Sequence, residues 1–250
     1  MVEIIEDKLF HVRSFFTKTK QDIDTFTVHS QLIKLLNDVR VITKKGEQKE
    51  YTHTTIPSKN SEGHIVGGGK YNFSNQENND KLKDNLALCI EHNYYPSTLS
   101  LTQKIGTTSC VHIDLDFRYP PTTTIRQYSL SNVSSLINII NNCIKDIYDV
   151  PKEKVNAYVF ERKSGVVQQT EVTKDGIHLL YPEIITNTKT QYALRDEIIK
   201  RALTLFKQEF KSINSVEDIV DKAVIENSNW MLSGARKVDR DPYELTLVFS

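Results

Sequence analysis

The chain has 250 residues, of which 38% are hydrophobic and 26% are charged, a composition typical of a folded globular protein. Its 32 basic and 32 acidic side chains cancel, so nucleic-acid binding would require a local basic groove. No apolar run approaches the length of a membrane span, and the charged N-terminus is unlike a signal peptide, which argues against membrane and secreted proteins. Three widely spaced cysteines predict reduced core residues rather than disulfides or a zinc site.

The first 94 residues contain helical apolar spacing at residues 9–16 and 29–36, followed by a polar segment over residues 41–80. Within that segment, Gly67, Gly68 and Gly69 precede Lys70, and such glycines could bring backbone N–H groups to a phosphate. The spacing of a Walker loop is missing, so a hairpin tip is the favoured interpretation. A short helix over residues 84–92 and a strand over residues 97–104 follow.

Residues 109–117 alternate between apolar and polar side chains, which predicts a β-strand. Asp114 and Asp116 then lie on one face, while Ile113, Leu115 and Phe117 point to a core. Two adjacent carboxylates repel each other, and Mg²⁺ or Mn²⁺ would relieve that repulsion because these cations favour oxygen ligands. Two incidental aspartates at the end of an exposed strand are the alternative.

The remaining elements alternate between strands and helices. Two prolines after Tyr119 stop the aspartate strand, because proline cannot extend a ladder. Apolar spacing predicts helices over residues 131–149, with Ser131 or Asn132 as N-cap, and over residues 189–211. Strands are expected over residues 155–161, 174–182 and 243–249, the second entered through a turn at Gly176. This alternation favours an α/β or α+β fold.

Several residues could complete a site with the aspartate pair. His178 lies in an apolar strand two residues after Gly176 and close to Lys174, so it is either a hydrogen-bonded core histidine or a donor to a bound phosphate. Arg162 and Lys163 form a basic turn.

Asp221 ends a short apolar segment, and a third carboxylate there would allow two cations to bind side by side. Asp218 competes for this role, although a helix N-cap is its expected use. The turn with Ser233, Arg236 and Lys237 suits a triphosphate or is simply an exposed turn. Trp230 upstream of the turn is either a stacking surface or a core residue.

Taken in order, these motifs resemble the catalytic domain of archaeo-eukaryotic-type primases, specifically the primase part of the primase–helicases of poxviruses, asfarviruses and giant viruses. The resemblance rests on an Asp-x-Asp strand, a small-x-His strand and a later apolar strand that ends in aspartate. It extends over roughly residues 95–249. The motifs of the viral branch are Lys-x-Gly-x-His at 174–178 and Trp-x-x-x-Gly-x-x-Lys at 230–237, followed by Pro-Tyr at 242–243.

The resemblance implies an RRM-like sheet with a packed N-terminal α/β unit, forming one catalytic domain over residues 1–250. The N-terminal unit would occupy about residues 1–94 and the motif-bearing core about residues 95–250. Asp114, Asp116 and Asp221 would hold two Mg²⁺ or Mn²⁺ ions for nucleotidyl transfer. Nucleotide binding is expected from His178, Lys174, Gly176, Ser233, Arg236 and Lys237, and template or primer contacts from Arg162 and Lys163.

The expected partners are single-stranded DNA, nucleoside triphosphates and a helicase. This chain has no Walker motif. We therefore expect it to be either an excised N-terminal domain of a primase–helicase or a gene product whose helicase is encoded separately. The expected location is the host cytoplasm or a viral replication compartment. A metal-dependent nuclease and a non-catalytic nucleic-acid-binding module remain alternative functions.

Overall fold

The computed structural model describes residues 25–44, 47–59, 63–91, 100–226, 228–237 and 240–250. They form two compact units: a core unit of residues 105–228 and 245–250, and an N-terminal unit that ends at residue 104 and also includes residues 229–244. Both units combine helices with antiparallel strands, which confirms the predicted α+β class. The helix predicted over residues 9–16 lies outside the described residues, and the single catalytic domain stays a prediction.

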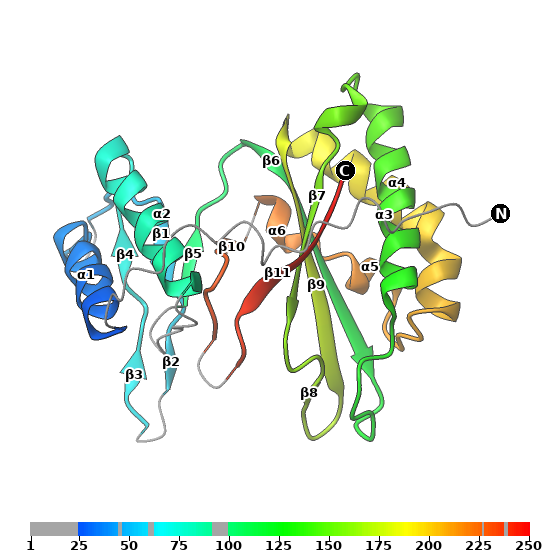
Figure 1. Cartoon of the computed structure of the whole chain (residues 1–250), viewed down its shortest axis with the longest axis horizontal. Helices are drawn as coiled ribbons and strands as arrows, with labels where there is room; N and C mark the ends of the chain where they lie inside the picture. Colours follow the sequence, from blue (N-terminus) through cyan, green and yellow to red (C-terminus); the bar gives the residue numbers. More distant parts are fainter. Residues whose placement is uncertain (1–24, 45–46, 60–62, 92–99, 227, 238–239) are drawn as a thin grey trace. The chain divides into compact units, whose positions relative to one another are not determined.

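The core unit is built on a sheet with the strand order β11-β7-β9-β6 (Figure 1). The long strand β9 pairs antiparallel with both β6 and β7, and β8 pairs with its N-terminal end. Helix α3 connects β6 to β7, and α4 connects β9 to the later elements, which gives β-α-β-β-α-β connectivity with β6 at the edge of the sheet. The strands are β6 (Thr108–Tyr119), β7 (Ala157–Arg162), β8 (Val167–Gln168), β9 (Thr173–Asn187) and β11 (Tyr243–Phe249).

Helices α3 and α4 pack together on one face of this sheet (Figure 1). Ile113, Leu115 and Phe117 of β6 point into the core under these helices, as the alternation of that strand predicts. The even-numbered residues of β6 point to the opposite face, which we call the site face. The helices of this unit are α3 (Leu130–Ile147), η3 (Lys152–Lys154), α4 (Thr188–Gln208), α5 (Val216–Ile219) and α6 (Ala223–Glu226).

Three local predictions about α3 and β9 are wrong. Helix α3 is capped by Ser129, and Asn132 occupies the third helical position of a capping box instead of the cap itself. Gly176 makes no turn, because it lies within β9 and pairs with Asp116 across the ladder. Strand β9 also continues beyond Pro182, since a register shift opposite Cys110 and Val111 leaves that proline outside the pairing.

The outer edge of β6 is covered by the segment that follows α4. Ile213 N–H donates to the carbonyl of Arg118 at 2.8 Å, and the Asn214 side-chain amide donates to the carbonyl of Asp116 at 3.0 Å. Further along, Val220 forms an antiparallel bridge with Leu115. The expected apolar strand before Asp221 is therefore the short helix α5 followed by one bridging residue. Ser215 caps this helix, so Asp218 is not its N-cap.

The N-terminal unit has a sheet with the order β10-β5-β1-β4, against which α1 and α2 pack (Figure 1). The predicted helix over residues 29–36 is part of α1, and Trp230 is buried, as its core interpretation requires. Thr55 accepts a hydrogen bond from Gly69 N–H through its side chain and one from Gly68 N–H through its carbonyl. These glycine N–H groups are therefore already engaged by protein. The elements are α1 (Thr25–Asp38), β1 (His53–Thr55), β2 (Ser58–Lys59), β3 (Ile65–Val66), β4 (Lys70–Tyr71), α2 (Gln76–Glu91), β5 (Leu101–Gln103) and β10 (Trp230–Met231).

Among the described residues, every helix is too short or too polar to cross a lipid bilayer.

Candidate metal and nucleotide site

Asp114, Asp116 and Asp221 each place a carboxylate oxygen within 4.8 Å of the other two. We call this cluster the acidic triad. Asp114 and Asp221 are half-buried, and Asp116 is exposed. Three carboxylates at this separation repel one another unless a cation or a proton lies among them. The structure thus brings together the three residues for which the sequence predicts metal binding, and their role as ligands stays a prediction.

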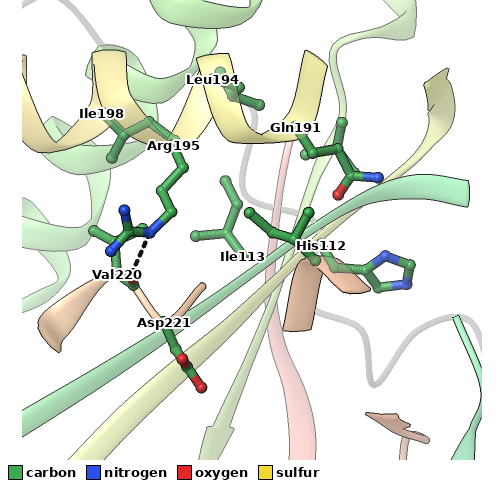
Figure 2. Close-up of a pocket in the computed structure, with 10 residues that line it drawn as sticks. His112, Ile113, Gln191, Leu194, Arg195, Ile198, Val220 and Asp221 are labelled. Carbon is green, nitrogen blue, oxygen red and sulfur yellow. Dashed lines mark hydrogen bonds between the residues drawn. The ribbon is translucent and has the colours of Figure 1, made fainter. Parts of the chain in front are cut away.

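Asp221 is held beside β6 by its own backbone and by a side chain of α4. Its N–H donates to the carbonyl of Asp114 at 2.9 Å, and its side chain accepts a hydrogen bond from Ala223 N–H at 2.9 Å. Arg195 donates from Nε to the carbonyl of Val220 at 2.8 Å and from Nη2 to that of Glu217 at 2.7 Å. Figure 2 shows Arg195 reaching down from α4 to Val220, while the Asp221 side chain points away from it.

His178 lies directly across the ladder from Asp114, with its Nε2 3.5 Å from Asp114 Oδ1. Only 7% of this histidine is exposed, and Phe160 of β7 is its partner on the other side. Cross-strand partners share a face of the sheet, so Phe160, His178 and Asp114 form one row on the site face. The histidine is therefore both well packed and adjacent to the acidic triad, and its role as a donor to phosphate stays a prediction.

A basic pair lies on the same face beyond Asp116. Gly176 is opposite Asp116 and adds no side chain there, and the next pair on this face is Arg118 with Lys174. Both of these basic side chains are exposed. Arg118 is not identified from the sequence, because this residue lies just before the two prolines that end the strand. Extending the period of two from Asp114 and Asp116 by one step would have identified it.

The basic turn of Arg162 and Lys163 is present as predicted, closed by a hydrogen bond from Gly165 N–H to the carbonyl of Arg162 at 3.1 Å. Arg126 fixes this turn by donating from Nη2 to the same carbonyl at 3.0 Å. The Arg126 guanidinium also contacts Glu161 at 2.8 Å and Asp175 at 2.9 Å. This ionic cluster ties β7 to β9 just before Gly176, and no pattern in the sequence predicts it.

His112 lies on the site face of β6, two residues before Asp114. Burial lowers the pKa of His112 to about 4, so the ring is neutral at pH 7. It lines a small pocket together with Gln191, Arg195 and Asp221 (Figure 2). Its Nε2 lies 3.6 Å from Sγ of Cys110, whose pKa is raised by burial. A neutral imidazole and a protonated thiol add no charge to the acidic triad.

The turn with Ser233, Arg236 and Lys237 belongs to the N-terminal unit. Gly234 adopts φ 76° and its N–H donates to the carbonyl of Tyr243 at 3.3 Å, so the turn is closed by the start of β11. Arg236 Nε is buried and makes no hydrogen bond with the described residues. A guanidinium with unused donors is suited to an anion. Binding of a triphosphate by this turn stays a prediction.

The site combines an acidic triad on an antiparallel sheet with a neighbouring histidine and exposed basic side chains. This combination is typical of enzymes that act on phosphate esters with divalent cations. Residues 64–249 match the family described as "C962R protein N-terminal AEP domain", which is an archaeo-eukaryotic primase domain. The match extends over more than half of the chain, and the chain belongs to this family. The resemblance found in the sequence motifs is confirmed.

A relative named "Putative helicase L207/L206", from Acanthamoeba polyphaga mimivirus, is 28% identical over 224 residues, or 88% of this chain. The matched region is only 22% of that protein, so the chain spans about a fifth of its length. Similarity to a giant-virus protein named as a helicase agrees with the predicted viral primase–helicase branch.

Proposed function

We propose that this chain is a primase module that synthesises short primers on a single-stranded DNA template. The observation that carries this proposal is the convergence of Asp114, Asp116 and Asp221 in a chain of the archaeo-eukaryotic primase family. Polymerases and related phosphoryl-transfer enzymes use such clusters to hold cations beside the reacting phosphate. The helicase would be a further domain or a separate subunit, and the module would act in the cytoplasm or the viral replication compartment of the host cell.

The acidic triad fits Mg²⁺ or Mn²⁺ because it offers only oxygen ligands and Gly176 leaves the space opposite Asp116 free of a side chain. When bound, two such cations would lower the pKa of the attacking hydroxyl and neutralise charge on the triphosphate. The backbone hydrogen bond from Asp221 N–H to the carbonyl of Asp114 keeps the third carboxylate close to the strand that carries the other two.

The charged and polar side chains around the triad orient the nucleotide. His178 donates to a phosphate oxygen, while Lys174 and Arg118 neutralise charge at the far end of the site face. We assign Ser233, Arg236 and Lys237 to the triphosphate from the chemistry of their turn. Arg162 and Lys163 at the exposed turn would contact the backbone of the template or primer.

A primer-synthesis assay on single-stranded templates, with Mg²⁺ or Mn²⁺ and with each nucleotide set, tests this function. Wild-type protein is expected to make short products. Asp116→Asn is expected to reduce synthesis by at least about 100-fold, since even loss of an outer-shell partner of a metal ligand costs up to that much. The matched control is Asp218→Asn, which makes the same chemical change on the exposed side of α5 and should leave synthesis unchanged.

Two results would contradict the proposal. Synthesis by Asp116→Asn at the wild-type rate would remove the acidic triad from the reaction. Cleavage of a labelled single-stranded oligonucleotide by the wild-type protein, without any extension, would instead identify a metal-dependent nuclease.

A further inference from the structure

The N-terminal unit has a cleft of its own, with a volume of about 640 Å³. Tyr51, Lys70 and Lys104 line it, and so do the acidic side chains of Glu47 and Glu50. A volume of this size is within the range of sites that bind small ligands or single nucleotides. The motifs of the acidic triad do not include any of these residues, so the cleft needs an explanation of its own.

The cleft lies beside the polar face of the β10-β5-β1-β4 sheet. Tyr71 and Leu101 point to the helices α1 and α2, whereas Thr54, Lys70 and Thr102 are cross-strand partners on the other face. The hydroxyls of Thr54 and Thr102 are 2.8 Å apart, and Lys104 follows Thr102 by two residues, so strand alternation directs it to the same face. Charged and hydroxyl side chains on this face argue against packing on another apolar surface.

Two lysines converge on one aromatic ring in this cleft. The Nζ atoms of Lys70 and Lys104 lie 4.7 and 5.1 Å from the centroid of the Tyr51 ring. Both lysines are exposed, and neither forms an ion pair with the described residues. Lys49 is different, because its Nζ is 3.3 Å from Glu47 Oε1 and its charge is already compensated. Lys70 and Lys104 therefore keep their charges available for an anionic ligand.

We propose that this cleft binds single-stranded nucleic acid, with a base on the Tyr51 ring and flanking phosphates on Lys70 and Lys104. An aromatic ring beside cations is the combination that binds single strands without sequence preference. An acidic peptide would use the lysines but not the ring, and a duplex keeps the faces of its bases stacked within the helix. This inference rests on the proposed function only in that a primase needs a single-stranded template.

The test is binding of a fluorescein-labelled oligothymidylate to the 250-residue chain, followed by fluorescence anisotropy in EDTA and without nucleotides. Tyr51→Ala is expected to weaken binding by roughly 5-fold or more, whereas Tyr51→Phe keeps the ring and should bind like the wild type. The double variant Lys70→Gln/Lys104→Gln should reduce the slope of log K against log salt by about 1.4, since each contact with a single-strand phosphate contributes about 0.7.

Lys81→Gln/Lys83→Gln on α2 is the matched control, because it removes the same charge from exposed lysines that pair with Glu77 and Asp80. We expect this control to bind the oligonucleotide like the wild type. Wild-type affinity and salt slope in both cleft variants would overturn the inference, as would an equal loss in the α2 control. Because the assay involves no synthesis, its failure would be distinct from a failure of the proposed primase activity.

Discussion

At the scale of single residues, strand alternation carries most of the information about the acidic triad. The period of two in β6 was sufficient to predict that Asp114 and Asp116 share a face and that Leu115 is buried between them. The placement of Asp221 beside them rests on the family pattern more than on its own surroundings, because its neighbours Ile219 and Val220 give no local signal of proximity to β6. Arg118 and Phe160 belong to the same face and were missed, since the first resembled a stop signal and the second an ordinary strand residue.

His178 provides a residue-scale test of nucleotide binding. We expect His178→Ala to weaken binding of a nucleoside triphosphate by about 10-fold, the cost of one hydrogen bond to a charged group. The check is a titration with a fluorescent nucleotide, together with thermal melting. His64→Ala, at an exposed position in the N-terminal unit, is the control for loss of an imidazole. If binding is lost only because the protein unfolds, His178 is a core histidine.

At the scale of elements, the helices and the long strands were predictable and their ends were not. Apolar periodicity located α3 and α4 to within a few residues. Gly176 was misread because a glycine after Asp175 is usual in turns, whereas here both residues are paired with β6 along the ladder. The segment 213–221 could not be predicted to cover the edge of β6, since its hydrogen bonds join residues about a hundred positions apart.

The contact between α4 and the end of α5 makes Arg195 a positioning residue for Asp221. Arg195→Met keeps the apolar stem but leaves the carbonyls of Glu217 and Val220 without their donor. We expect the free energy of unfolding to fall by about 1–3 kcal/mol, the usual cost of losing hydrogen bonds made by a charged group. Binding of Mn²⁺ should weaken as well, because the backbone that carries Asp221 loses its anchor to α4.

Urea denaturation and an Mn²⁺ titration measure these two effects separately. Arg201→Met is the control on the same helix, where the guanidinium pairs with Asp146 and Glu197 at the surface. Equal Mn²⁺ affinity in the two variants would mean that Arg195 only stabilises the fold.

At the scale of the whole molecule, the family match and the candidate site fall in the same part of the chain. The match covers residues 64–249, and the acidic triad, His178 and the Arg118–Lys174 pair all lie in the core unit. Composition and net charge gave no hint of nucleic-acid chemistry, because 32 basic and 32 acidic side chains cancel over the chain. The relevant charges are local, and only the fold separates an acidic triad from the basic side chains around it.

The most direct test of the acidic triad is titration of the protein with Mn²⁺, followed by electron paramagnetic resonance of the free ion. Wild-type protein and Asp218→Asn are expected to bind Mn²⁺ equally well, while Asp114→Asn, Asp116→Asn and Asp221→Asn each lose at least about 10-fold in affinity because a charged oxygen ligand is removed. The same Mn²⁺ affinity in all five proteins would contradict a metal site at these three aspartates.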